Sequence, residues 1–227
     1  MTQMNADQKK EHPILFSGEM VRAILDGRKT QTRRVVKPPL QNSDYPNPKL
    51  DSGEFCVCPD LLPTSDKREL VIVHCESRGI YRHMGSKVFA EEFCPYGVPG
   101  DRLWVRETWS RVENGHWCPI GGDPVYKADG GSYSGSGFRW ISSIHMPRWA
   151  SRITLEITGV RVERLQGISE EDCIAEGCDG SSAGFGEAVS KTLSHAWFFQ
   201  LWDSINDKKH PWASNPWVWV IEFRKVT

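Results

Sequence analysis

Apolar positions near the start of the chain follow the spacing of a helix. The residues that share one helical face are Met20, Val21, Ile24 and Leu25. Ser17 before this run and Gly27 after it are the residue types preferred at helix caps, so we expect a helix over residues 17–26. The following stretch, GRKTQTRRVV, is rich in Thr and Val and predicts a strand.

Further strands are predicted by short apolar runs and by alternation. They are ELVIVHC, a weaker KVFAEEF, DRLWVRETW after a Pro-Gly turn, the long RITLEITGVRVERL, and NPWVWVIEFRKV near the end. Two more helices are indicated by ISEEDCIAEG and AVSKTLSHAWFFQLWDSIN. The first of these helices has Ser169 as its expected N-cap and Gly177 as its terminator.

Strands dominate this order of elements. We therefore expect an α+β fold in which a β-barrel is flanked by helices. Residues 1–12 are polar and indicate a flexible tail, and residues 13–227 indicate a single domain. Two segments rich in loop-forming residues, about 38–97 and 110–148, interrupt it as insertions.

Composition adds little to this picture. The 227 residues are 39% hydrophobic and 25% charged, which is typical of a globular domain with a buried core. Lys and Arg number 28 against 29 for Asp and Glu, so any contact with nucleic acid must come from a local patch. No apolar run is long enough to span a membrane, and the polar start lacks an export signal. We expect a cytoplasmic protein without a membrane partner.

The stretch GRKTQTRR, residues 27–34, contains the densest group of cations. Its members are Arg28, Lys29, Arg33 and Arg34. Cations after a helix C-terminus complement the helix dipole, so a solvated basic turn is one interpretation. The other interpretation is a clamp for phosphate or for an anionic transition state.

A second candidate is GDRLWVRETW. Here Arg106 and Glu107 lie between Trp104 and Trp109, and the aromatic rings are suited to stacking on a nucleobase. An edge-strand ion pair beside core tryptophans is the alternative. Glu176 is a third candidate, because an acid at the end of a helix is disfavoured by the dipole.

The cysteines allow a metal site but do not require one. The possible tetrahedral zinc ligands in the first insertion are Cys56, Cys58, Cys75 and Cys94. Their spacing differs from the usual pairs of C-x₂-C, so inert thiols and no cofactor are the simpler interpretation. Cys173 and Cys178, on either side of Glu176, are expected to be packing residues.

These motifs together resemble the ASCH family, whose fold is a PUA-like β-barrel and whose members are associated with RNA and modified nucleobases. The family motif G-x-K-x-x-E-x-R is matched by Gly27, Lys29 and Arg34, with Thr32 in the position of the Glu. PGDRLWVRETW and WVWVIEFRKV are similar to the family's central and closing strands. The layout also resembles longer ASCH proteins of phages and prophages, and the two insertions lie outside the resemblance.

The GRKT-x-T-x-R variant is similar to a subset of bacterial ASCH proteins that are N4-acetylcytidine amidohydrolases. That resemblance implies a catalytic set of Lys29, Thr32 and Glu176. Thr32 would attack the acyl carbonyl, Lys29 would take its proton, and Glu176 would pass a proton to the leaving amine or activate water. Arg34 or Arg106 would stabilise the oxyanion.

This chemistry places a condition on the backbone. In a straight strand Lys29 and Thr32 point to opposite faces, so residues 28–32 must be bent or helical. A non-catalytic module that binds RNA or a modified base, and a ribonuclease, remain the alternatives, because one fold supports several functions. The partner implied in each case is a modified nucleoside or RNA.

Overall fold

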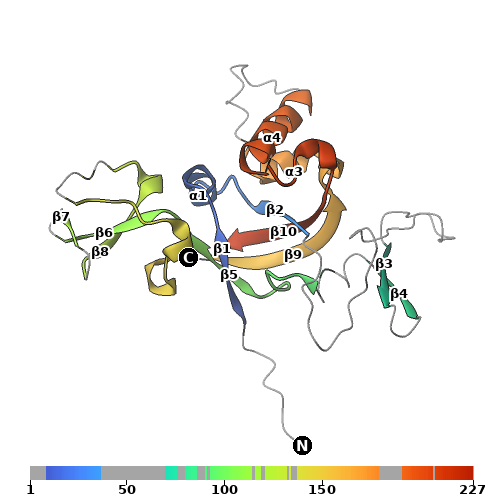
Figure 1. Cartoon of the computed structure of the whole chain (residues 1–227), viewed down its shortest axis with the longest axis horizontal. Helices are drawn as coiled ribbons and strands as arrows, with labels where there is room; N and C mark the ends of the chain where they lie inside the picture. The colour runs from blue at the N-terminus through green and yellow to red at the C-terminus, as the bar shows by residue number, and fades with distance from the viewer. Residues whose placement is uncertain are drawn as a thin grey trace, which may run out of the picture.

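A five-stranded sheet forms the centre of the molecule (Figure 1). The computed structural model describes residues 9–36, 70–75, 80–85, 90, 93–113, 116–118, 121–131, 133, 137–178, 191–206 and 208–226. In spatial order the strands are β1 (Glu11–Leu15), β5 (Arg102–Arg106), β9 (Thr154–Arg164), β10 (Trp217–Lys225) and β2 (Gln31–Val35). β1 runs parallel to β5, and the other neighbours are antiparallel. The described strands leave β1 and β2 as edges, so this mixed α+β sheet is open rather than closed into a barrel.

Three helices are described, and they lie where the apolar spacing predicts them. They are α1 (Gly18–Leu25), α3 (Glu170–Ala175) and α4 (Lys191–Asn206). The Ser17 side chain accepts a hydrogen bond from the Met20 N–H, and the Ser169 side chain accepts one from the Asp172 N–H. Both predicted N-caps are therefore confirmed. The described helices lack the length and apolar content that a membrane span needs.

The sheet is covered on both faces. On one face Trp219 and Ile221 of β10 pack in a cluster with Val21 and Ile24 of α1. The other face is covered by α3 and α4. There Val218 and Val220 pack with residues such as Phe198 and Trp202. Burial on both sides explains why β10 reads as a continuous apolar run.

A second lobe is formed by a three-stranded sheet of order β7-β6-β8. Its strands are β6 (Trp109–Glu113), β7 (His116–Trp117) and β8 (Asp123–Tyr126). The described 3₁₀ turns are η3 (Lys127–Asp129), η4 (Ser143–His145), η5 (Arg148–Ala150), η6 (Leu165–Gly167) and η7 (Trp212–Ser214). The lobe contacts α1 through η3, where Arg22 Nη1 donates to the Ala128 carbonyl over 3.1 Å. A separate hairpin joins β3 (Leu70–Cys75) to β4 (Ile80–Gly85).

Three expectations from the sequence need correction. Residues 1–12 were predicted to be a flexible tail, but strand β1 begins at Glu11, so residues 11 and 12 belong to the sheet. Pro13 lacks an N–H, which weakened the strand signal but is tolerated in an edge strand. In KVFAEEF the described residues Ala90 and Phe93 are helical rather than extended. The insertion 110–148 contains the ordered strands of the second lobe.

Candidate functional site

The chain turns sharply between α1 and β2. Gly27 has φ +76°. Its N–H bonds the Ile24 carbonyl, and the Arg28 N–H bonds the Ala23 carbonyl. This is a Schellman turn, and the left-handed conformation explains the glycine. Strand β2 starts only at Gln31, so residues 28–30 lie in the turn and the segment from Lys29 to Thr32 is not one straight strand.

The C-terminus of α3 ends in a second turn of the same kind. Gly177 has φ +106°, and a Cβ there would lie 3.2 Å from Ala23 Cβ and 3.3 Å from Lys29 Cβ. The two turns are thus in contact. Three donors from residues 28–30 satisfy the last carbonyls of α3. The bonds are Thr30 N to Ala175 O (2.8 Å), Lys29 Nζ to Glu176 O (2.8 Å) and Arg28 Nη1 to Gly177 O (3.1 Å).

Lys29 and Glu176 form a buried ion pair at this junction. Lys29 Nζ lies 2.6 Å from Glu176 Oε2, and the two side chains are 0% and 3% exposed. Desolvation lowers the pKa of Lys29 below 10.5, although the charge and hydrogen bond of Glu176 act in the opposite direction. A buried pair contributes little net stability compared with apolar side chains, so its presence indicates another role.

Arg33 belongs to a network on the α3 side of the sheet. Its Nη2 lies 2.8 Å from Asp172 Oδ2 and 3.2 Å from Glu163 Oε2, and its Nη1 lies 3.4 Å from Glu176 Oε1. Burial raises the pKa of Asp172, but the charge and hydrogen bond of Arg33 outweigh it and hold that pKa below 3.8. Arg161 contacts the same carboxylate. Both terminal nitrogens of the Arg33 guanidinium therefore contact carboxylates of the protein.

Arg34 lies on the opposite face of β2. Its Nη2 donates to the Leu15 carbonyl over 2.6 Å, and its guanidinium lies over the Phe16 ring at 5.2 Å. No carboxylate within the described ranges forms an ion pair with it. Desolvation lowers the pKa of Arg34. This cation is the one in the octapeptide best able to accept an anionic ligand.

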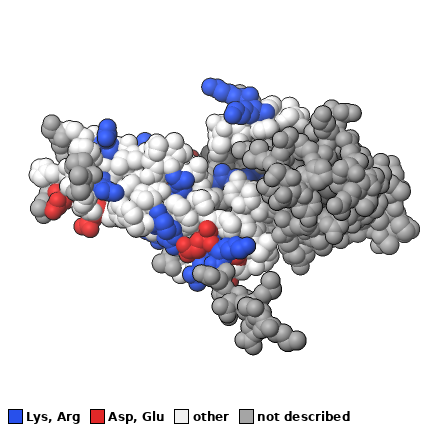
Figure 2. Space-filling view, turned by 60° about the horizontal axis from the view of Figure 1, so that its bottom comes forward, with Lys and Arg blue, Asp and Glu red and all other residues white. Residues whose placement is uncertain are grey.

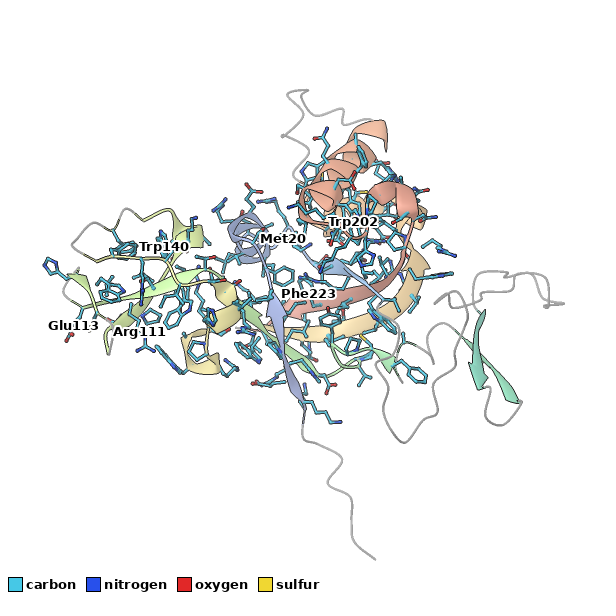
Figure 3. All side chains as sticks on the ribbon, viewed as in Figure 1. Met20, Arg111, Glu113, Trp140, Trp202 and Phe223 are labelled. Carbon is cyan, nitrogen blue, oxygen red and sulfur yellow. The ribbon has the colours of Figure 1, made fainter. Side chains whose placement is uncertain are left out.

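A cleft lies between α1 and α4, and its smaller part reaches residues 32–35 of β2. It consists of a cavity of about 330 Å³ and a smaller one of about 70 Å³, both lined by Met20, Glu176 and Leu201. Thr32 lines the smaller cavity. Figure 3 shows Met20 on α1 and Trp202 on α4 at the two sides of this region.

The edge of β2 gives this cleft backbone hydrogen-bonding groups. Val36 N donates to Trp217 O, and Phe223 N donates to Thr30 O. Residues with even numbers therefore direct their peptide groups toward β10. The peptide groups of residues 31, 33 and 35 face the edge that no described strand pairs with, and residues 33 and 35 line the smaller cavity.

The structure places Lys29 against Glu176, and Glu176 and Thr32 line the same small cavity, whereas the GDRLWVRETW residues lie elsewhere. Glu107 is buried and forms a double hydrogen bond with Arg152 over 3.0 and 3.1 Å. Trp109 is buried in the second lobe beside Tyr126 and Met146. Trp104 and Arg106 lie on β5, and none of the four lines the cleft.

Other lining residues were missed from the sequence. Trp197 and Leu201 of α4 line the larger cavity. Their i, i+4 spacing was a signal for a shared helical face, but it also fits an ordinary core helix.

The cysteines give no support for a metal centre. Cys56, Cys58 and the side chain of Cys75 lie outside the described residues, so the zinc hypothesis stays a prediction. Burial raises the pKa of Cys94 to about 11. In the described part of the chain, no group of three or more His, Cys, Asp or Glu residues is arranged to hold a metal ion. Cys173 and Cys178 are both buried, as expected for packing residues.

Comparison with protein-family models, with curated proteins and with solved structures found no match to this chain.

Proposed function

We propose that this protein is a nucleobase-directed hydrolase that removes the N4-acyl group from a modified cytosine. The observation that carries the proposal is the buried Lys29–Glu176 pair, which adjoins a cleft lined by both Glu176 and Thr32. The resemblance to ASCH amidohydrolases adds support from the same three residues. We further propose that the five-stranded sheet is the core of a PUA-like fold.

The cleft has the dimensions and polarity for a modified base. The larger cavity, of about 330 Å³, is in the lower range of small-molecule sites and would hold the base, with the acyl group directed into the smaller cavity of about 70 Å³ that Thr32 lines. Cytosine presents a donor and two acceptors along one edge, and the peptide groups of β2 beside the smaller cavity offer both kinds of partner. Met20 and Trp197 supply apolar walls for the ring.

Acyl transfer to Thr32 is the first chemical step. A proton first passes from the Lys29 ammonium to the Glu176 carboxylate across their 2.6 Å contact, and the neutral amine then takes the hydroxyl proton as Thr32 Oγ1 bonds to the acyl carbon. The protonated carboxyl of Glu176 donates its proton to N4 as the C–N bond breaks, and cytosine leaves as the amine. The Lys29–Glu176 pair then consists of ammonium and carboxylate, the charge state that the 2.6 Å contact favours.

Water completes the cycle. Glu176 takes one proton from water as the hydroxyl bonds to the acyl carbon of the Thr32 ester. The ester bond breaks, the carboxylic acid leaves, and Lys29 returns its proton to Thr32. Arg34, which lacks a carboxylate partner among the described residues, is placed on the Thr32 side of the strand to stabilise the oxyanion.

A second candidate is a module that binds the modified base without chemistry. The observation in its favour is that Lys29 Nζ already donates to both the carbonyl and the carboxylate of Glu176. In that case Lys29 serves to cap α3 and to hold β2 against it. The cleft and the edge of β2 would still serve to bind the base.

Turnover of N4-acetylcytidine to cytidine, followed by chromatography, tests the proposal. Thr32→Ala should abolish turnover, Thr32→Ser should retain part of it, and Lys29→Met should lower kcat by about 10²- to 10⁴-fold. Thr30→Ala is the matched control, since Thr30 is an exposed threonine two residues away. Its turnover should equal that of the wild type.

A folded wild-type protein without turnover, but with saturable binding of N4-acetylcytidine, would refute the hydrolase and favour the binding module. Circular dichroism and thermal unfolding of each variant separate loss of chemistry from loss of structure.

A further inference from the structure

The second lobe carries an exposed tryptophan next to an arginine. Trp149, on η5, is 57% exposed. The Arg111 guanidinium of β6 lies 4.6 Å from its ring centroid, and the buried Trp109 meets it edge-on at 5.6 Å (Figure 3, where Arg111 is labelled). The contacts with Arg111 and Trp109 fix the orientation of the Trp149 ring, and its exposed part offers a rigid stacking surface for a ligand.

A second group of the same kind lies beside it in the chain. Trp104 of β5 has Arg106 at 5.5 Å and Arg148 at 6.0 Å from its ring centroid. Arg148 and Trp149 are consecutive residues of η5, so this turn connects the two groups. We refer to Trp104, Arg106, Arg111, Arg148 and Trp149 as the arginine–tryptophan surface.

The three arginines of this surface differ in the partners that the described residues give them. Arg148 is paired with Glu11 over 2.8 Å. Arg106 donates to the Ile144 carbonyl, and the Arg111 guanidinium lies against the rings of Trp109 and Trp149. Among the residues that the structure describes, no carboxylate forms an ion pair with Arg106 or Arg111. On the face drawn in Figure 2, Lys and Arg are spread widely, whereas Asp and Glu gather in few places.

We propose that the arginine–tryptophan surface binds single-stranded nucleic acid. Unpaired bases stack on Trp149 and on the accessible part of Trp104, while Arg106 and Arg111 contact phosphates. An acidic peptide would use the charges but not the ring faces. A duplex keeps its bases stacked internally and cannot use them either.

This surface extends the proposed function from a free nucleoside to a base within a strand. The lobe is joined through η3 to α1, and α1 forms one wall of the cleft. The link between the arginine–tryptophan surface and the cleft rests on the proposed function, whereas binding of nucleic acid at the surface does not depend on it.

Fluorescence anisotropy with a labelled RNA of about 12 nucleotides, free of acylated cytosine, tests the inference. The full chain should bind it, and Trp149→Ala should weaken binding at least about fivefold. Trp149→Phe should restore most of the affinity. Phe199→Ala is the control, since Phe199 is an exposed aromatic residue of α4 outside the surface. Its affinity should equal that of the wild type.

Salt dependence distinguishes phosphate contact from stacking alone. Arg111→Gln should reduce the slope of log Kd against log salt by about 0.7, the value for one phosphate contact on a single strand. Lys29→Met should lower kcat for hydrolysis as stated above but leave RNA binding unchanged. Absence of RNA binding at low salt, equal affinity of Trp149→Ala and wild type, or tighter binding of a duplex would each overturn the inference.

Discussion

Removing the charge of Glu176 should destabilise the folded protein strongly. In Glu176→Gln the Lys29 ammonium keeps its backbone bond to residue 176 but loses the carboxylate at 2.6 Å. Both side chains are almost fully buried, so water cannot replace the lost partner. Breaking one side of such a pair costs about 3–5 kcal/mol of unfolding free energy at pH 7.

The double variant Lys29→Met/Glu176→Gln should regain most of this loss. Methionine has a similar length and carries no charge that requires a partner. Urea unfolding at 25 °C measures each free energy. With a slope of about 3 kcal/mol/M, the single variant should shift the midpoint down by about 1–1.7 M. The coupling between the two sites follows from the double-mutant cycle.

The Glu176→Gln variant should also become pH-dependent. Glu176 raises the pKa of Lys29 against the effect of desolvation, so its removal lowers that pKa further. The unfolded chain then binds more protons than the folded protein between this lowered pKa and 10.5. Stability should therefore rise with pH through that window and fall as the pH is lowered.

An exposed pair provides the control. The side chains of Arg148 and Glu11 are 44% and 36% exposed, and Glu11→Gln should cost less than about 1 kcal/mol. Burial of the pair would not explain its effect on stability if Glu176→Gln lowered the free energy of unfolding no more than Glu11→Gln does. The same holds if the free-energy effects of Lys29→Met and Glu176→Gln are additive in the double variant.

Three further predictions concern local structure. In a thermal unfolding assay, Gly177→Ala should lower the free energy of unfolding by at least about 1 kcal/mol, because φ is +106° and the new Cβ would press on Lys29. Gly100→Ala should lower it by less, because Gly100 has a similar φ of +98° but open space around it. Ser169→Ala should cost about 1 kcal/mol in urea unfolding by removing the N-cap bond of α3. Burial raises the pKa of Cys173 to about 12, so peptide mapping after alkylation at pH 8 should find it modified only when urea unfolds the protein.

Local patterns were sufficient for the helices and the long strands. Ser17 and Gly27 bracket α1 as their chemistry predicts, because caps depend on residues within one turn. Ile153, Leu155 and Ile157 are all buried, as their alternation requires. The edge strand β1 was missed because five residues that include a proline give almost no periodic signal.

The candidate site depended on contacts that no local pattern contains. Lys29 and Glu176 are 147 positions apart, and only the packing of two helix-terminal turns brings them to 2.6 Å. From the residues alone, Glu176 was marked only by its unfavourable place at a helix end. Likewise, Trp109 and Trp149 have the same side chain, but one is buried and the other exposed.

By itself the sequence determined the caps, the helical faces and the alternation of the strands, because these depend on neighbours a few residues away. Only the tertiary structure decided that β1 and β2 are the edges of the sheet among the described strands, and which described cations contact a carboxylate. The physical reason is that strand order, desolvation and ion pairing are set by residues far apart in the chain.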